Sequence, residues 1–328
     1  MAAGLGKRLR PLTWEFPKPV VPVANRPVIE HILRGLAAQD VREVICNLHW
    51  FPETIRGPLG DGSQLGVELA FEHEEELLNT AGGVRNVADW LTAGGGTFLV
   101  MAGDALTDVD FAALVEAHRR HGGVATLGVK PVTNVEEYGV IIADSDGRIQ
   151  GFQEKPDRAE ALSDLVNCMI YAFEPEVFDY FPDQPTPDFA LDVFPALLGH
   201  DVPFHVHRID RYWNDVGSIP EYLQGNLDVV QGLVGVEPAG EIIEGGRDEE
   251  SPAEQEGGWE LSGRALVGEQ ATIAPGARID GPAVIGPGTS VGADAIVKRS
   301  VLLPGAEVPA SGLLAGSIAG RRGRLAEA

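Results

Sequence analysis

The N-terminal segment AAGLGKRLRPLTWEFPKP combines residues that are suited to bind phosphate. Two glycines, Gly4 and Gly6, stand beside four basic residues, which are Lys7, Arg8, Arg10 and Lys18. Glycine lets backbone N–H groups approach an anion closely, and the basic side chains add positive charge. This pattern predicts a phosphate site whose natural ligand is a triphosphate. It lacks the third glycine of a dinucleotide fingerprint and the Ser or Thr of a P-loop, so a plain surface turn is the alternative.

Two aspartates from distant parts of the chain predict a site for a divalent cation. Asp104 ends the strand-like run VMAGD, and Asp215 lies in YWNDVG. Mg²⁺ favours one or two protein carboxylates together with substrate phosphate oxygens, so we predict that both residues bind Mg²⁺. For either aspartate taken alone, a turn or a helix cap is the alternative.

A third motif, GFQEKP, places Glu154 directly before Lys155. Ligand hydroxyl groups suit the carboxylate and a ligand phosphate suits the ammonium group. The alternative is an exposed ion pair that contributes little to stability.

Alternating β-rich and helical segments must position these residues. The predicted strands are Glu43–Leu48, Val67–Phe71, Thr97–Met101, Ala125–Val129 and Asn167–Phe173, and the predicted helices are Val28–Ala38, Ala81–Leu91 and Asp110–His121. Such alternation is typical of an α/β domain with a mostly parallel sheet, whose ligands bind at the carboxyl ends of the strands.

The C-terminal part follows a period of six residues. Aliphatic residues recur at Val267, Ile273, Ile279, Ile285, Val291, Val297 and Leu303. This period predicts a β-helix of three walls per coil, in which the aliphatic side chains stack inward. A loose Gly/Pro-rich tail is the alternative.

Between these parts, residues 236–260 carry nine acidic residues and one basic residue, with little to bury. We predict an acidic linker or surface loop there. The predicted domains are therefore 1–235, 236–260 and 261–328. The run His73-Glu74-Glu75-Glu76 is likewise expected to be a solvated charge run.

The composition restricts the partners. Asp and Glu number 49 against 25 Lys and Arg, a formal charge of −24, which disfavours nucleic acid and anionic membranes. No apolar run reaches the length of a membrane helix and no signal peptide begins the chain, so we expect a soluble, cytoplasmic protein. The two cysteines, Cys46 and Cys168, lie in apolar runs and are interpreted as core residues.

Taken in order, the motifs resemble those of the sugar-nucleotide pyrophosphorylases, the nucleotidyltransferases that make nucleoside-diphosphate sugars. AAGLGKRLRPLT with PKP is similar to the family's G-x-G-[ST]-R-L…PKP signature, and NTAGG at Asn79–Gly83 is similar to its G-T-A-G loop. The resemblance implies a Rossmann-like three-layer domain followed by a short left-handed β-helix.

The resemblance also implies a set of site residues. It places the triphosphate near Ala3, Gly4, Gly6, Lys7, Arg8 and Lys18. It assigns the nucleotide to Asn79, Thr80, Ala81, Gly82 and Gly103, and the sugar phosphate to Tyr138, Gly139, Glu154, Lys155 and Asn167. Asp104 and Asp215 would bind Mg²⁺, and the residues acting in catalysis would be Arg8, Lys18, Asp104, Lys155 and Asp215.

Four positions depart from the family pattern. The family's first strand normally precedes AAG, where Met1 stands here, which predicts a loosened phosphate loop. Lys7 replaces Thr or Ser. Asn79 replaces the first glycine of G-T-A-G, a change that is tolerable if the backbone there is left-handed, which Asn accepts better than most residues. Cys168-Met169 replaces a pair of small residues and predicts an altered sugar pocket.

The implied reaction joins a nucleoside triphosphate to a sugar 1-phosphate and releases pyrophosphate. The sequence KPVVPVANRPVIEHILRGL is most similar to the mannose-1-phosphate guanylyltransferase branch, with glucose-1-phosphate uridylyl- or thymidylyltransferase as the alternative. A non-catalytic regulatory subunit is a further alternative. Acyl transfer in the repeat is disfavoured because every histidine precedes it. We expect a homo-oligomer.

Overall fold

The computed structural model describes residues 1–14, 16–321 and 323–327 and separates into two compact units. The first unit comprises Met1–Gly4, Leu33–Gly103 and Val109–Trp213. The second comprises Leu5–Ile32, Asp104–Asp108 and Asn214–Ala328. The segment 1–235, predicted as one domain, is thus divided between the two units.

The first unit is an α/β domain. Its strands are β3 (Glu43–Leu48), β4 (Glu68–His73), β5 (Phe98–Met101), β7 (Ala125–Pro131), β8 (Gly139–Ala143), β9 (Ile149–Glu154), β10 (Leu165–Phe173) and β11 (His205–Arg208). Its helices are α2 (Pro52–Leu59), α3 (Asn79–Arg85), α4 (Ala88–Thr92), α5 (Phe111–His121) and α6 (Phe194–Gly199), with a π-helical turn, η7, at Phe189–Val193. Helix α1 (Val28–Ala38) contains the boundary between the units.

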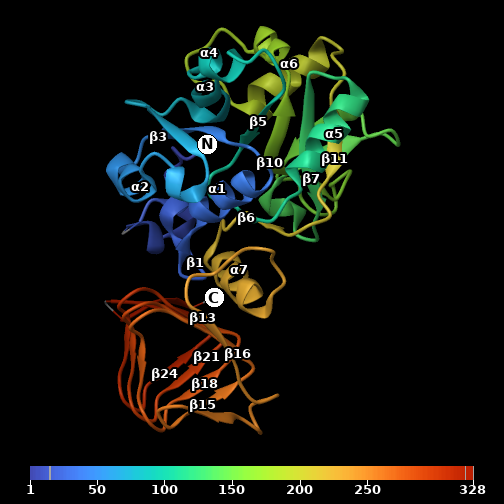
Figure 1. Cartoon of the computed structure of the whole chain (residues 1–328). Coiled ribbons are helices and arrows are strands. Elements are labelled where there is room, and N and C mark those ends of the chain that lie inside the picture. Colours follow the sequence, from blue (N-terminus) through green and yellow to red (C-terminus); the bar gives the residue numbers. More distant parts are fainter. Residues whose placement is uncertain (15, 322, 328) are drawn as a thin grey trace. The chain divides into compact units, whose positions relative to one another are not determined.

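The main sheet of this unit is mixed, so the prediction of a mostly parallel sheet is wrong. Strand order is β11-β7-β10-β8-β9, and β5 also pairs with β10, as Figure 1 shows for the central strands. Only the β11–β7 pair is parallel, and the other pairs are antiparallel. Strand β10 runs antiparallel to β5, β7 and β8. Strands β8 and β9 form a hairpin, because the connection 144–148 is too short for the crossover helix that parallel neighbours need.

The sheet is covered on both faces. Helix α5 begins after Asp110, whose carboxylate accepts a hydrogen bond from Ala113 N at 2.9 Å, and its His118 bonds to Thr126 of β7. Leu127 of the same strand belongs to a cluster rich in Phe that includes residues of η7 and α6. Because successive strand residues face opposite sides, α5 and the aromatic cluster cover opposite faces.

Strands β3 and β4 form a separate parallel pair. Among the described residues, no strand hydrogen-bonds to both β3 and β5. The first two residues of the chain lie there instead: the Met1 amine donates to Met101 O, Met1 O accepts from Gly103 N at 2.7 Å, and Ala2 N donates to the Asn47 side chain at 2.9 Å. Met1 and Ala2, at the start of the phosphate motif, are therefore hydrogen-bonded on two sides.

The second unit contains the strands β1 (Pro22–Val23), β2 (Arg26–Pro27) and β6 (Leu106–Thr107) and helix α7 (Ile219–Gln231), with β12 (Trp213–Asn214) at the unit boundary. Its C-terminal part folds into three sheets. The first sheet contains β13 (Glu241–Glu244), β16 (Arg264–Val267), β19 (Ala283–Ile285), β22 (Val301–Leu302), β25 (Ser317–Gly320) and β26 (Gly323–Glu327). The second sheet contains β14 (Ala253–Gln255), β15 (Trp259–Ser262), β18 (Arg278–Asp280), β21 (Ile296–Lys298) and β24 (Leu313–Ala315). The third sheet contains β17 (Thr272–Ile273), β20 (Ser290–Val291) and β23 (Glu307–Val308).

Parallel pairing across successive coils is consistent with a β-helix, whose left-handed sense stays a prediction. Ile273 pairs with Val291, and Val291 in turn pairs with Val308, so the second step along the chain is one residue shorter than the first. This shift places Leu302 rather than the predicted Leu303 in register with Ile285, although both leucines are buried.

The acidic segment 236–260 is not a linker without structure, because it contains strands. Glu241–Glu244 forms β13, which pairs antiparallel with β16, and Ala253–Gln255 forms β14, which pairs with β15. The acidic side chains at the two ends of β13 stay exposed while Ile242 and Ile243 are partly buried. The high charge content of the segment therefore did not predict its strands, which pair with β16 and β15.

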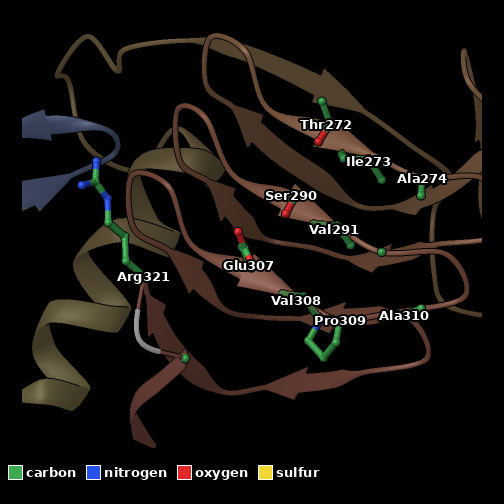
Figure 2. A pocket seen from close by; sticks show the side chains of 12 residues that line it. Thr272, Ile273, Ala274, Ser290, Val291, Glu307, Val308, Pro309, Ala310 and Arg321 are labelled. Carbon is green, nitrogen blue, oxygen red and sulfur yellow. The ribbon is translucent and has the colours of Figure 1, made fainter.

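Two further features complete the fold. A hollow of about 570 Å³ lies against β17, β20 and β23 of the second unit, and Figure 2 shows its lining from Thr272 to Arg321. None of the predicted site residues lines it. In the described part of the chain, no helix has the length and apolar content needed to cross a membrane.

The corners of the β-helix repeat a left-handed backbone conformation at stacked positions. Gln270, Gly288 and Gly305 have φ values of 59°, 64° and 71°. They occupy equivalent corners of successive coils, which are joined by hydrogen bonds from Gly288 N to Glu269 O and from Gly305 N to Pro287 O. A side chain at such a corner is strained even when space is available.

We predict that Gly288→Ala destabilises the protein by about 1 kcal/mol, because φ is +64° although nothing lies within 4 Å of an added Cβ. The matched control is Gly35→Ala in α1, which also has free space but a helical φ, and which is expected to stabilise by roughly 0.5–1 kcal/mol. Urea denaturation of both variants measures the difference. Equal effects of the two substitutions would contradict the backbone argument.

Candidate active site

Lys18 is the centre of a charged cluster in the second unit. Its side chain is 11% exposed, and its Nζ lies 2.9 Å from Asp104 Oδ2. The same Nζ donates to the backbone oxygen of Asp215 at 2.8 Å. A buried ammonium group requires such partners because desolvation would otherwise be too costly. Lys18 thus connects the PKP, AGD and WNDVG motifs. The spacing of these motifs in the sequence did not predict this contact.

Asp215 lies in a tight turn that precedes helix α7. Its Oδ1 accepts from Gly217 N at 3.0 Å, and an added Cβ on Gly217 would meet Asp215 Oδ2 at 2.4 Å. Between them, Val216 has φ +48°, which is rare for a β-branched residue. Strain of this kind persists only where the surrounding structure imposes it, and it is concentrated at functional sites.

Helix α7 adds a carboxylate that the sequence analysis missed. Ser218 caps the helix, and its hydroxyl donates to Glu221 Oε2 at 3.0 Å. The signal was present in SIPE, since Ser followed three residues later by Glu is a capping box. Glu221 also interacts with Asp215, and this contact raises the pKa of Asp215.

The pKa of Asp215 is raised to about 6, mainly by burial and then by the negative charge of Glu221, while Lys18 and Arg8 oppose the rise. The carboxylate therefore has too little positive charge around it, as is typical of a group that binds a cation. No cluster of three or more His, Cys, Asp or Glu suited to a metal exists among the described residues. Two carboxylates, Asp104 and Asp215, nevertheless fit Mg²⁺, which takes its other ligands from phosphates and water.

The phosphate motif spans a unit boundary, with Ala3 and Gly4 in the first unit and the turn from Gly6 onward in the second. Gly6 has φ +57°, and an added Cβ would meet Lys18 Cβ at 2.9 Å, so this position requires glycine. The Arg8 guanidinium lies 3.5 Å from Asp215 Oδ2 with 57% of its side chain exposed. Lys7 is exposed as well, whereas Ala3 is buried. A Cβ added to Gly4 would have no other atom within 4 Å.

In the first unit, the loop NTAGG begins helix α3. Asn79 has φ +61°, so the condition under which Asn is tolerated in place of the family's glycine is met. Its side chain donates to Thr186 O at 2.9 Å, and the Thr80 hydroxyl donates to Asp188 Oδ2 at 2.8 Å. Gly82 N donates to Pro187 O at 3.0 Å. Hydrogen bonds to the segment 186–188 therefore fix the loop, which leaves Ala81 in the core.

Two more residues beside this loop were missed. Glu74, expected in a solvated charge run, is only 3% exposed, and Asn47 of β3 is 8% exposed. Asn47 Nδ2 donates to Glu74 Oε1 at 2.6 Å. The flanking Glu75 and Glu76 are exposed as predicted. Nothing in the local pattern distinguishes Glu74 from its neighbours, because its partner lies 27 residues away.

The predicted sugar-phosphate residues meet through strand pairing in the first unit. Gly139 pairs with Glu154 across β8 and β9, and Val166 pairs with Val140, which places Asn167 beside Gly139. Lys155 N donates to Tyr138 O at 3.1 Å. Glu154 and Lys155 form an exposed ion pair at 3.8 Å, so both remain accessible to a ligand.

Strand β10 bulges at Asn167. Its register shifts between Asn167 and Tyr171, and Met169 has φ +53°. Asn167 Oδ1 accepts from Met169 N at 2.9 Å, and its amide donates to the Tyr171 hydroxyl at 2.9 Å. A bulge redirects side chains and is frequent beside active sites. The replacement of a small pair by Cys168-Met169 thus falls within this irregularity of β10.

Both cysteines are free and buried, in agreement with their interpretation as core residues. Burial raises the pKa of the Cys46 thiol to about 11, which keeps it protonated and unreactive at neutral pH.

We predict that Asp215→Asn stabilises the metal-free protein at pH 7 by up to roughly 3 kcal/mol. Because the pKa of Asp215 in the folded protein, about 6, lies above its ordinary value of 3.8, the folded state binds more protons between these values. Wild-type stability therefore falls as pH rises from 4 to 6, whereas the variant lacks this loss. Urea denaturation with a chelator at pH 4, 5, 6 and 7 measures it, and parallel curves for the two proteins would refute it.

Comparison with known proteins identifies the family. Residues 1–232 match the nucleotidyl transferase family. The chain is 34% identical over 319 residues to a UTP–glucose-1-phosphate uridylyltransferase of Synechocystis sp., covering 92% of this chain and 81% of that protein. It is 34% identical over 303 residues to a mannose-1-phosphate guanylyltransferase of Mycobacterium tuberculosis, covering 91% and 82%.

Among solved structures, HddC from Yersinia pseudotuberculosis matches with a TM-score of 0.60 at 23% identity, covering 69% of this chain and 95% of that one, which supports the fold. Because the family match and both relatives span most of the sequence, the chain belongs to the nucleotidyl transferase family, among the sugar-nucleotide pyrophosphorylases.

Proposed function

We propose that this protein transfers a nucleotidyl group to a sugar 1-phosphate, and that its substrates are GTP and mannose 1-phosphate. The observation that carries nucleotidyl transfer is the Lys18 cluster. It brings together a phosphate motif and two carboxylates that are separated by as many as 197 residues in the sequence.

The reaction needs no protein nucleophile. An oxygen of the sugar 1-phosphate bonds to the α-phosphorus of the triphosphate, and the bond from that phosphorus to the β-phosphate oxygen breaks. Pyrophosphate leaves with the electron pair. Since the attacking phosphate is already anionic, no general base is required, and catalysis consists of alignment and charge neutralisation.

The residues of this chain divide these tasks. Lys155 holds the attacking phosphate, and its exposed ammonium group is free to reach it. Arg8 stabilises the departing pyrophosphate from its exposed position beside Asp215. Lys18 orients Asp104 and adds positive charge. Asp104 and Asp215 are the residues that would hold Mg²⁺, which when bound neutralises phosphate charge.

The choice of GTP and mannose 1-phosphate is supported by several relatives. Besides the Mycobacterium tuberculosis protein, mannose-1-phosphate guanylyltransferases of Drosophila melanogaster and Arabidopsis thaliana align over 98% of this chain. The second candidate, glucose-1-phosphate uridylyl transfer, is favoured by the Synechocystis relative at the same 34% identity.

We predict that Asp104→Asn lowers kcat for pyrophosphate release by about a hundredfold or more, because the loss of one charge-stabilising ligand removes this order of rate enhancement. The amide still accepts a hydrogen bond from Lys18, so the fold is retained. Coupled pyrophosphate detection measures the rate. Asp89→Asn, at an exposed position in α4, is the control, and wild-type turnover in Asp104→Asn would refute the assignment.

A substrate panel tests the specificity. We predict that GTP with mannose 1-phosphate gives the highest kcat/KM among four nucleoside triphosphates combined with mannose, glucose and N-acetylglucosamine 1-phosphates. Pyrophosphate release scores every pair under the same conditions. A higher kcat/KM for UTP with glucose 1-phosphate would select the second candidate instead.

A further inference from the structure

The buried pair of Asn47 and Glu74 has a structure that a solvated charge run lacks. A carboxylate removed from water is costly unless its oxygens accept hydrogen bonds. Both Glu74 oxygens do: Oε1 accepts from Asn47 Nδ2 at 2.6 Å, and Oε2 accepts from Leu78 N at 3.0 Å. Both oxygens of the Glu74 carboxylate are thus satisfied inside the protein, unlike those of a solvated surface acid.

The pair connects the start of the chain to the nucleotide loop, which we define as residues 78–83. Asn47 Oδ1 accepts from Ala2 N at 2.9 Å, so three hydrogen bonds run from Ala2 through Asn47 and Glu74 to Leu78. Leu78 directly precedes Asn79, the residue with the left-handed backbone. All of these residues belong to the first unit.

Packing places the pair directly against the loop. An added Cβ on Gly83 would meet Glu74 Oε1 at 2.5 Å and Asn47 Nδ2 at 2.6 Å. The glycine therefore leaves room for the hydrogen-bonded pair. The backbone under Glu74 is also fixed, because Glu74 N donates to Leu48 O at 2.8 Å and Glu74 O contacts His49 Nδ1 at 2.9 Å.

We propose that Asn47 and Glu74 are positioning residues for the nucleotide, which hold the nucleotide loop in its binding conformation without touching the ligand. This inference rests on the proposed function, with the nucleotide bound at residues 79–82 as the family resemblance implies. Loosening the pair raises the KM for the nucleotide, because part of the binding energy then orders the loop. The KM for the sugar 1-phosphate and the value of kcat stay nearly unchanged.

An exchange of the two side-chain chemistries tests the pair. Glu74→Gln leaves an NH₂ group facing either Asn47 Nδ2 or Leu78 N–H, so one hydrogen bond is lost whichever way the new amide turns. The double variant Asn47→Asp/Glu74→Gln reverses the central bond and restores all three hydrogen bonds at the same total charge. Glu75→Gln, at the exposed neighbouring acid, is the matched control for charge.

We expect Glu74→Gln to raise the KM for the nucleotide about tenfold, the effect of losing one hydrogen bond to a charged group. The double variant is expected to recover most of this loss, and Glu75→Gln to behave as wild type. Steady-state pyrophosphate release gives KM and kcat. Hydrogen exchange at the Leu78 amide gives a readout that is independent of turnover: it should quicken in Glu74→Gln and slow again in the double variant.

The outcomes are distinct. An unchanged nucleotide KM in Glu74→Gln would overturn the proposal. If the double variant restored slow exchange but not the KM, the Glu74 carboxylate would contact the ligand itself, which would also overturn the proposal. Absence of pyrophosphate release in wild type would instead defeat the proposed function and the nucleotide role with it, while the exchange data would still show whether the pair holds the loop.

Discussion

The burial of one ammonium group constrains the phosphate-binding part of this protein. Lys18 forms an ion pair with Asp104 and donates a hydrogen bond to the backbone oxygen of Asp215, so the segments that carry these residues must meet around it. Gly6 has no side chain because Lys18 Cβ occupies the space. Lys18 therefore holds together three segments that are far apart in the sequence.

Four residues in the motifs assigned to ligands have a positive φ without being glycine, which are Asn79, Lys155, Met169 and Val216. The same backbone occurs outside these motifs, for example at Gln270 in a corner of the β-helix. Asp215 adds an electrostatic cost through its raised pKa. Glycine would relieve the backbone strain at each of these positions, so stability alone does not explain the residues that stand there. Costs of this kind are typical of sites that are preorganised for a ligand.

The sequence predicted those features that depend on local periodicity. The bounds of β3 and α1 agree residue for residue with the predicted ones. Features that depend on partners far along the chain were not predictable. The antiparallel pairing of β10 with β5, β7 and β8 makes the sheet mixed. Glu74 differs from its acidic neighbours through its contacts with Asn47 and Leu78.

The shortened step between coils of the β-helix shows where its length is free to vary. Asp280 lies opposite Lys298 and Val284 lies opposite Val301, so the corner at 281–283 is matched one coil later by the shorter corner at 299–300. Side-chain stacking inside the walls leaves no freedom for an insertion or a deletion, whereas a corner absorbs one by changing its turn. A difference of one residue between successive coils is thus accommodated at a corner, while the walls on either side keep their pairing.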